Sequence, residues 1–323
     1  MGELFGMWRN TRMVVLTAIC AALYAAVLIP FKVVPVIPGV TEFRPANAVP
    51  VVCSFLFGPA AAWGAAFGNL IGDFFGGLGP GDFFGFFANL AYGAIPYLVW
   101  DALTTRDPLL DPRATGTDLL ALSTVAGGGA ALAVVGGLAL AGLPPRAATL
   151  GIAVALVVLA AAVLAVRRPA WLLEREVLGP TVALLGVVVL AATCCADVVG
   201  WGLQLLGFHP FTVLGTFVLV NNLVVAGILA PFLLRALHPR VRRARLHYRD
   251  LLGPRPRPPR WRAVLGVALA TAGIVGTFVA GEAIASHRWL APWAPFPSAS
   301  GALAVGLGLA PSLAVAVGGL ALL

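Results

Sequence analysis

The stretch PAAAWGAAFGNLIGDFFGGLGPGDFFGFFANL, residues 59–90, decides the fold class of this chain. Two apolar runs flank the turn GGLGPG, and the only charged residues in the stretch are Asp73 and Asp82. In the first run a glycine recurs at every fourth position, which places these glycines on one helix face and lets another helix approach closely. They are Gly64, Gly68, Gly72 and Gly76. The stretch therefore predicts two membrane-embedded, closely packed helices.

The rest of the chain has the same character. Of its 323 residues 60% are hydrophobic and 11% are charged, whereas a soluble globular protein has about 25% charged residues. So many apolar residues have to face lipid, where a helix pairs its backbone N–H and C=O groups internally. We predict an all-α polytopic membrane helix bundle of about ten transmembrane helices of about 20 residues each. The apolar runs are 12–29, 46–57, 59–78, 83–100, 118–142, 147–166, 180–206, 211–236, 263–285 and 301–323.

Basic residues indicate the orientation, because Lys and Arg concentrate in cytoplasmic loops. With the N-terminus inside, ten spans place seventeen of the 21 Lys and Arg residues in inner segments. The four outer ones are Lys32, Arg44, Arg146 and Arg288. This bias predicts a multi-pass protein of the cell membrane with both termini in the cytoplasm.

An Arg- and Pro-rich segment, residues 237–262, divides the chain. We predict a main membrane domain over residues 1–236, with an inserted hairpin at 118–166, followed by this basic cytoplasmic linker. A C-terminal two-helix membrane hairpin then occupies residues 263–323. The arginines of the linker are typical of contact with anionic lipid head groups, and docking of a cytosolic partner is the alternative.

Motifs for catalysis, cofactors and metals are absent from the sequence. The only lysine, Lys32, is followed by valine, so a P-loop GK[ST] cannot form. There is no HExxH, no GxSxG and no strand followed by GxGxxG. The arginines lie between apolar runs rather than on a folded soluble module, which argues against nucleic-acid binding. We expect no enzyme, and we interpret the cysteines as small buried residues: Cys20, Cys53, Cys194 and Cys195.

Polar residues inside membrane helices are costly and indicate function. Run 46–57 makes a helix of only about 18 Å, and short or Gly/Pro-interrupted segments tend to border a binding cavity. Asn69 and Asp73 lie one helical turn apart beside the glycine stripe, and Asp82 and Asn89 share a helix face. These four residues are candidate substrate-binding groups.

Three more candidates lie where the chain re-enters the membrane after a Pro-rich outer loop: Glu42, Arg44 and Asn47. Glu42 and Arg44 either pair with each other at the membrane interface or contact a ligand.

A second polar stripe runs along the seventh apolar span, where Asp197, Trp201 and Gln204 share one face. Asn221, next to Asn222, lies within the eighth span. An internal Asp with a Trp one turn away suits a polar, flat ligand, and hydrogen bonding between helices is the alternative. In the ninth span we expect Glu282, and His287 after it, to lie at the membrane interface.

The first span carries a stripe of small residues, Ala18, Ala22 and Ala26, with a parallel one at Ala21 and Ala25. Such a stripe packs against the protein's own helices or offers a smooth face to another subunit.

The segment EFRPANAVPVVCSFLFGPAAAWGAAFGNLIGDFFGGLGPGDFFGFFANL, residues 42–90, resembles the substrate-specific (S) components of energy-coupling factor (ECF) transporters. It is most similar to the QueT-like branch, which is associated with uptake of queuosine precursors. The matching features are the FR pair followed by Pro, the GP turn, the GN…GD helix and the GPGD…G…N stretch. The resemblance covers residues 10–100 well and 180–236 loosely.

The resemblance implies a six-helix core made of spans one to four, seven and eight, with two inserted and two C-terminal helices as additions. Such a subunit binds a small vitamin- or nucleobase-like compound from outside and joins a membrane coupling protein and cytosolic ATPase subunits. The Ala18/Ala22/Ala26 stripe would be the docking face. The implied ligand wall is Glu42, Arg44, Asn47, Asn69, Asp73, Asp82 and Asn89.

The residues alone leave another hypothesis open. An intramembrane carboxylate such as Asp73 or Asp197 also suits a stand-alone, proton-coupled secondary transporter of a small polar solute. A membrane enzyme acting on lipid, or a structural membrane protein without a ligand, are further alternatives.

Overall fold

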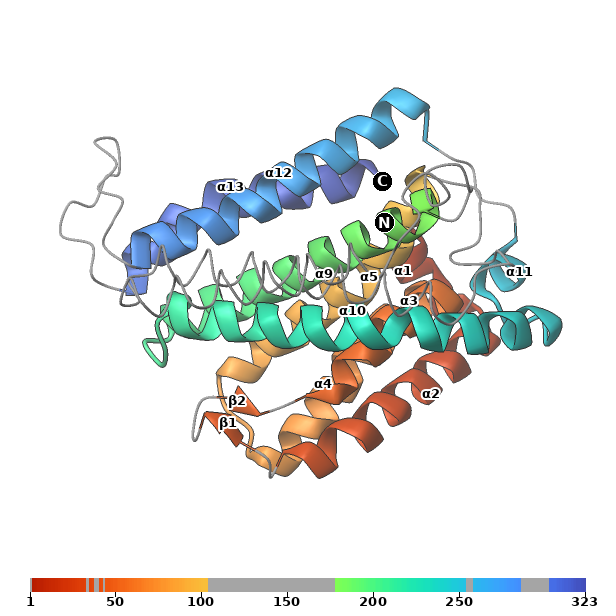
Figure 1. Ribbon diagram of the computed structural model, residues 1–323, viewed down its shortest axis with the longest axis horizontal. Coiled ribbons are helices and arrows are strands. Elements are labelled where there is room, and N and C mark those ends of the chain that lie inside the picture. Colours follow the sequence, from red (N-terminus) through yellow and green to blue (C-terminus); the bar gives the residue numbers. More distant parts are fainter. Residues whose placement is uncertain are drawn as a thin grey trace, which may run out of the picture.

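The computed structural model describes residues 2–32, 35–37, 41–42, 44–103, 178–253, 258–285 and 302–323, and within these it is an all-α membrane bundle (Figure 1). The long helices are α2 (Thr11–Leu28), α3 (Ala48–Phe57), α4 (Pro59–Gly76), α5 (Gly81–Leu103), α9 (Leu178–Leu205), α10 (Phe211–Arg243), α12 (Arg260–Ala285) and α13 (Ala302–Leu322). The short ones are α1 (Gly2–Gly6), η1 (Met7–Arg9), η2 (Ile29–Phe31), η3 (Pro45–Asn47) and α11 (Tyr248–Leu252).

Each described long helix coincides with a predicted apolar run, which confirms the fold class. Five of the described helices are long and apolar enough to cross a membrane, and the segments Pro45–Phe57 and Gly308–Leu322 are shorter apolar helices. The protein is therefore a multi-pass membrane protein. The predicted helices at 118–142 and 147–166 lie outside the described residues.

Local sequence explains where several helices begin and end. The side chain of Asn10 accepts hydrogen bonds from the backbone N–H groups of Arg12 and Met13 and so caps the start of α2. Gly58 adopts a positive φ of 55° between α3 and α4, and Pro59 then opens α4 with a fixed φ. The chain can therefore reverse between two helices without a loop.

Between α2 and α3 the chain forms a short antiparallel pair of strands, β1 (Pro35–Ile37) and β2 (Thr41–Glu42). Pro35 is paired with Glu42, and Ile37 with Thr41. The outer loop predicted between the first two spans therefore contains a small β-hairpin.

Six of the described helices contact one another in a closed series. Each helix in the series α2, α4, α5, α9, α10, α3 packs against the next (Figure 1). Helix α3 also contacts α2, α4 and α5, so the series returns to its first member. This is the set of spans that the sequence resemblance assigned to a six-helix core.

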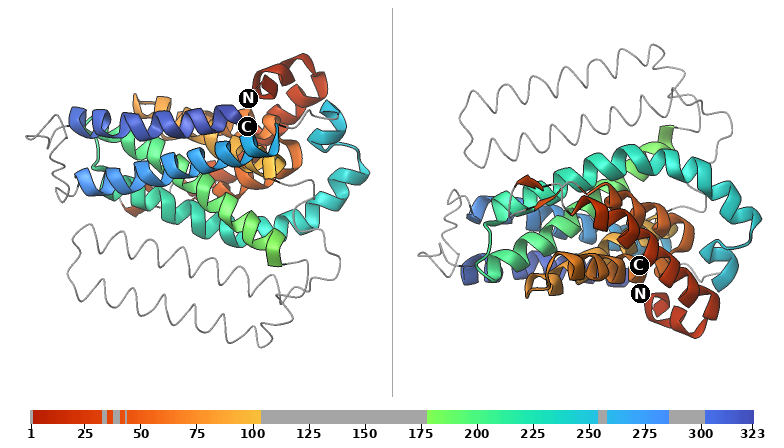
Figure 2. Two further views of the ribbon diagram at one scale, coloured as in Figure 1. Left: turned by 90° about the horizontal axis from the view of Figure 1, so that it is seen from above. Right: turned by 90° about the horizontal axis from the view of Figure 1, so that it is seen from below.

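The C-terminal helices α12 and α13 form a tight hairpin alongside α9 (Figure 2). Gly273 and Gly319 make the close approach possible, because a Cβ on either would come within 2.3 Å of a backbone nitrogen of the other helix. Thr277 Oγ1 also donates to Ser312 Oγ over 2.8 Å. The hairpin lies on the opposite side of the bundle from α2 (Figure 1).

Helix α10 continues beyond its predicted end at residue 236. Its 33 residues correspond to about 50 Å of helix, more than the hydrocarbon core of about 30 Å, so its arginine-rich last turns extend past the apolar region. Short α11 then folds back onto the bundle: Tyr248 donates to Asp101 Oδ1 of α5 over 2.6 Å, and its ring lies against Gly58. Part of the predicted linker is thus packed helix, and both termini lie toward this end of the bundle (Figure 1).

Glu282, which the sequence predicts at the membrane interface, lies near the end of α12. Its side chain is buried and accepts a hydrogen bond from Thr216 Oγ1 of α10 over 2.7 Å. The reason is that α12 packs against α10, a contact that the position of Glu282 near a helix end does not reveal. His287 lies outside the described residues.

Candidate functional site

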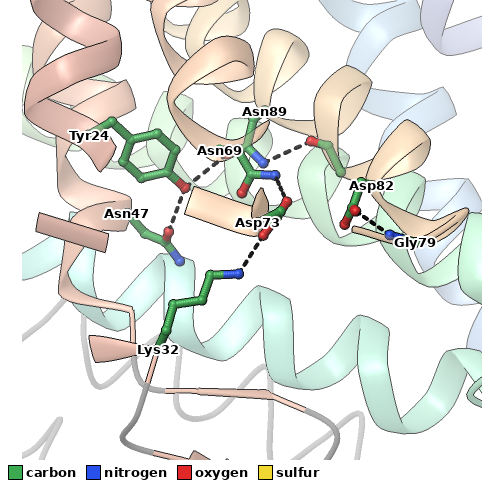
Figure 3. Close-up of polar contacts among 9 residues, drawn as sticks. Tyr24, Lys32, Asn47, Asn69, Asp73, Gly79, Asp82 and Asn89 are labelled. Atoms are coloured by element: carbon green, nitrogen blue, oxygen red, sulfur yellow. Dashed lines mark hydrogen bonds and ion pairs between the residues drawn. The ribbon is translucent and has the colours of Figure 1, made fainter. Parts of the chain in front are cut away.

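Tyr24 of α2 is the centre of a buried group of polar side chains (Figure 3). Its hydroxyl lies 3.1 Å from Asn47 Oδ1 and 3.0 Å from Asn89 Oδ1, so one proton is shared between two amide oxygens. Asn47 ends η3 and Asn89 lies in α5. The tyrosine therefore holds three separate segments in register.

The group extends from Asn47 to a fourth and a fifth residue. Asn47 Nδ2 donates to Asn222 Oδ1 of α10 over 2.5 Å, and Tyr92 of α5 donates to the backbone carbonyl of Asn47 over 3.0 Å. These contacts join residues that are 175 and 45 positions apart in the sequence.

A charged pair lies beside these amides. Lys32 Nζ, just after η2, is 2.7 Å from Asp73 Oδ1 of α4, and Asn69 Nδ2 donates to Asp73 Oδ2 over 2.5 Å (Figure 3). The carboxylate is mostly buried, and such a group needs a partner because an unpaired charge in an apolar interior is costly. The only lysine of the chain supplies that partner.

Gly85 of α5 lies between the amides around Tyr24 and the charged pair Lys32–Asp73. A Cβ at this position would lie 3.1 Å from Asn69 Nδ2 and 3.8 Å from Asp73 Oδ2. The carbonyl of the same glycine accepts a hydrogen bond from Asn89 Nδ2 over 2.8 Å. The absence of a side chain lets α5 approach the polar face of α4. We refer to the whole set as the polar cluster: Tyr24, Lys32, Asn47, Asn69, Asp73, Asn89, Tyr92 and Asn222.

Two atoms of the polar cluster are left without a hydrogen-bond partner among the described residues, Asn69 Oδ1 and Asn222 Nδ2. Both side chains are buried, and a buried polar atom without a partner needs an explanation. Between them the two atoms offer one acceptor and one donor. A ligand that presents an N–H and a C=O group would satisfy both.

The glycine stripe of α4 positions the polar residues of that helix. Gly64 lies against Cys20, Gly68 against Tyr24, and Gly72 against Leu28, with close backbone or side-chain approach at each position. The predicted close contact is therefore made by α2. Because Asn69 and Asp73 each directly follow a glycine of the stripe, they lie at the edge of this contact.

The structure brings together four of the predicted site residues, Asn47, Asn69, Asp73 and Asn89. Arg44, which precedes η3, is close enough to Tyr24 and Cys195 to interact with them electrostatically. The backbone of Glu42 lies in β2.

Other predicted residues lie apart from the polar cluster. Asp82 accepts a hydrogen bond from the backbone N–H of Gly79 over 2.7 Å, at the start of α5 (Figure 3). Gln204 Oε1 accepts from the backbone N–H of Phe211 over 2.7 Å and closes the turn between α9 and α10. Trp201 packs edge-to-face on Phe84.

Asp197 and Asn221 are also separate from it. The side chain of Asp197 is buried with no hydrogen-bond partner among the described residues. Asn221 is half-buried, and its neighbour Asn222 is the residue whose amide joins the network.

Sequence reasoning did not select Tyr24, Lys32 and Tyr92. One signal could have found Tyr24: it is the single polar aromatic residue in a first span made mostly of small and aliphatic residues. For Lys32, the signal was the need of Asp73 for a counter-charge combined with the presence of one lysine in the whole chain.

The chemistry of the cluster is that of hydrogen bonding. It contains amides, two phenols and one carboxylate that Lys32 neutralises. In the described parts of the chain, no group of three or more His, Cys, Asp or Glu residues could hold a metal ion. Such side chains recognise a ligand by the pattern of its donors and acceptors.

On the other face of α2, Ala18, Ala22 and Ala26 are exposed, whereas Ala21 and Ala25 are buried. Larger apolar residues, Val15, Ile19 and Leu23, are exposed beside the three alanines. The two parallel stripes therefore differ: the Ala21/Ala25 stripe lies inside the bundle, and the Ala18/Ala22/Ala26 stripe forms part of its surface.

A comparison with known protein families finds one match: residues 14–166 match the family described as QueT transporter. This match includes most of α2 and all of α3 to α5, and with them every residue of the polar cluster except Asn222. No curated protein and no solved structure matches the chain.

Proposed function

Because residues 14–166 match the QueT transporter family and the described helices are those of a multi-pass membrane protein, we propose that this chain is the substrate-binding subunit of an ATP-driven importer of the ECF type. The match supports a membrane transport protein for a small substrate rather than an enzyme. The proposed ligand is a small vitamin- or nucleobase-like compound, with a queuosine precursor as the first candidate.

The observation that carries the proposal is the polar cluster, in which Asn69 Oδ1 and Asn222 Nδ2 have no hydrogen-bond partner among the described residues. The cluster has buried amides from η3, α4, α5 and α10 and a carboxylate that Lys32 already neutralises. A net-neutral set of donors and acceptors suits an uncharged heterocycle with an amide-like edge, since burying an additional charge there would be costly. Tyr24 and Tyr92 supply flat apolar surface next to these amides.

The exposed stripe Ala18/Ala22/Ala26 supports the second half of the proposal, which is docking on a membrane coupling protein that carries cytosolic ATPase subunits. Small residues let two helices approach closely in lipid, where association depends on packing. We expect Ala22→Trp to weaken co-purification with the coupling protein, whereas Ala268→Trp on an exposed face of α12 provides the matched control.

The direct test is binding by the purified chain in lipid nanodiscs without ATP, measured by calorimetry with queuosine precursors and other nucleobase-like compounds. Saturable binding with a Kd in the micromolar range or below supports the proposal. Asp250→Asn is the control variant, because Asp250 of α11 pairs with Arg242 of α10 at the surface and makes no hydrogen bond with the cluster. If no compound of these classes binds, the proposal is rejected.

Uptake into proteoliposomes separates this function from proton-coupled transport by the lone chain. Uptake that requires the ATPase subunits and survives collapse of the proton gradient supports the importer subunit. Uptake by the chain alone that stops when the gradient collapses supports the alternative.

A further inference from the structure

The helix interface on the far side of α9 from the polar cluster holds two buried carboxyl groups. Asp197 of α9 is 0% exposed, and Glu282 of α12 is 6% exposed. The two carboxyl oxygens of Asp197 have no hydrogen-bond partner among the described residues. Glu282 has one for Oε1, which accepts from Thr216, and none for Oε2. Carboxyl groups inside a membrane protein are rare and are typical of ion and proton pathways.

Contacts around Phe211 link the helix segments that carry the two carboxyl groups. The ring of Phe211, at the start of α10, lies against Gly200 of α9 and against Gly281 of α12. Asp197 lies one helical turn before Gly200 on the same face. Glu282 directly follows Gly281, and its hydrogen-bond donor Thr216 follows Gly215, which also touches Gly200.

The site is separate from the polar cluster. On α9 the side chain of Cys195 lies near Asn222 of the cluster. Asp197 lies two residues further along, which is about 200° around a helix, and so points to the opposite side. Trp201, one turn from Asp197, packs against the cluster of Phe211 and Leu309, and so does Phe278 of α12, so the C-terminal hairpin covers this face.

No counter-charge is available in these elements. The segments 184–205, 211–230, 263–285 and 302–322 contain no charged residue apart from Asp197 and Glu282. Within these segments and the α9–α10 turn, the other titratable groups are the thiols of Cys194 and Cys195 and the ring of His209. Outside them, Arg44 interacts electrostatically with Cys195 but pairs with neither carboxyl group. Helix α5, which also packs on α9, carries Asp82 and Asp101 only at its two ends.

From this arrangement we propose that Asp197 and Glu282 are two proton-binding groups in the packed interface of α9, α10 and α12, covered by the α12–α13 hairpin. An ionised carboxylate with no partner in an apolar interior is strongly disfavoured, whereas the protonated acid is neutral and can itself donate a hydrogen bond. Too few ligating groups are present for a metal ion, since the described residues contain no cluster of three or more His, Cys, Asp or Glu. The site does not depend on the function proposed for the polar cluster.

Infrared spectroscopy of the purified chain in lipid nanodiscs tests the proposal. We expect the carbonyl band of a protonated carboxylic acid at neutral pH, and we expect Asp197→Asn and Glu282→Gln each to remove part of it. Asp250→Asn, which changes an exposed carboxylate in an ion pair, should leave the band unchanged. Absence of the band, or a band that both variants leave intact, would overturn the proposal.

Melting curves give a second readout. If the folded protein holds protons that the unfolded chain releases, the free energy of unfolding falls as pH rises, and Asp197→Asn reduces this slope. A melting temperature that responds to sodium ions at constant pH, and loses this response in Asp197→Asn, would show a cation site instead and reject the proton site.

Discussion

Lys32 Nζ lies 2.7 Å from Asp73 Oδ1, so the only lysine of the chain neutralises the carboxylate of the polar cluster. The stem of Lys32 runs past Gly76, where a Cβ would lie 2.9 Å from Nζ and 3.1 Å from Cδ. The last glycine of the α4 stripe therefore makes room for the lysine, and the stripe serves both helix packing and charge pairing.

Removing one partner of this pair should be much more harmful than removing both. Lys32→Met leaves a buried carboxylate uncompensated, and we expect it to lower the free energy of unfolding by about 3 kcal/mol. The double variant Lys32→Met/Asp73→Asn replaces the pair with neutral groups and should recover most of this loss. Melting curves of the purified protein check both.

The exposed ion pair Arg242–Asp250 provides the control. Arg242→Gln should change the free energy of unfolding by less than about 1 kcal/mol, because water screens an exposed pair. Equal losses in Lys32→Met and Arg242→Gln would show that the Lys32–Asp73 pair is not buried as described.

The second prediction concerns the contact between α2 and α4. A Cβ at Gly68 would lie 2.8 Å from the backbone oxygen of Ala21 and 2.9 Å from Tyr24 Cβ. Gly68→Ala must therefore push α2 and Tyr24 away, and we expect a loss of about 1 to 3 kcal/mol in stability together with weaker ligand binding.

Gly186 of α9 is the matched control, because no described residue comes within 4 Å of a Cβ built there. Gly186→Ala should leave stability unchanged or raise it by up to about 1 kcal/mol, the difference in helix propensity between the two residues. Thermal melting and ligand titration of the two alanine variants side by side make the comparison. Equal behaviour would contradict the close α2–α4 contact.

The fold could be predicted from the sequence because lipid imposes a simple rule. A segment such as 211–236 must be helical to pair its backbone groups, so apolar runs alone locate the helices. The close contact along Gly64 and Gly68 was also predictable, since a four-residue period defines one helix face. Which helix fills that face was not predictable, because periodicity carries no information about the neighbour.

The candidate site was predictable only in part, for the same reason. Asn69 and Asp73 are conspicuous as polar residues within one apolar helix. The hydrogen bond between Asn47 and Asn222, in contrast, joins residues 175 positions apart and depends on how α3 and α10 pack. For Asp82 a local signal did exist. An acidic residue in the first turn of a helix commonly accepts a hydrogen bond from a backbone N–H just before the helix, and in the structure Asp82 accepts one from the Gly79 N–H.

The third prediction tests the shared proton of Tyr24. Tyr24→Phe leaves the amide oxygens of Asn47 and Asn89 without this donor, which costs about 1 to 3 kcal/mol for buried groups. If the cluster binds the ligand, affinity should fall about tenfold, since tenfold corresponds to about 1.4 kcal/mol.

Tyr248→Phe is the same substitution at a distant site, where the hydroxyl donates to Asp101. It should lower stability but leave the Kd unchanged. Ligand titration by calorimetry separates the two variants, and an unchanged Kd in Tyr24→Phe would argue that the ligand does not contact this part of the cluster.

The last prediction distinguishes two neighbouring amides. The sequence pattern selected Asn221, whereas the structure places the buried amide of Asn222 against Asn47, with its own Nδ2 left open. Asn222→Ala removes the acceptor of Asn47 Nδ2 and the open donor together, so we expect affinity to fall about tenfold or more, that is, by at least about 1.4 kcal/mol. Asn221 lies about 100° away around α10, and Asn221→Ala should have a much smaller effect. Calorimetric titration of the two variants decides between them: the reverse order would mean that the ligand binds the face predicted from the sequence pattern and not the polar cluster.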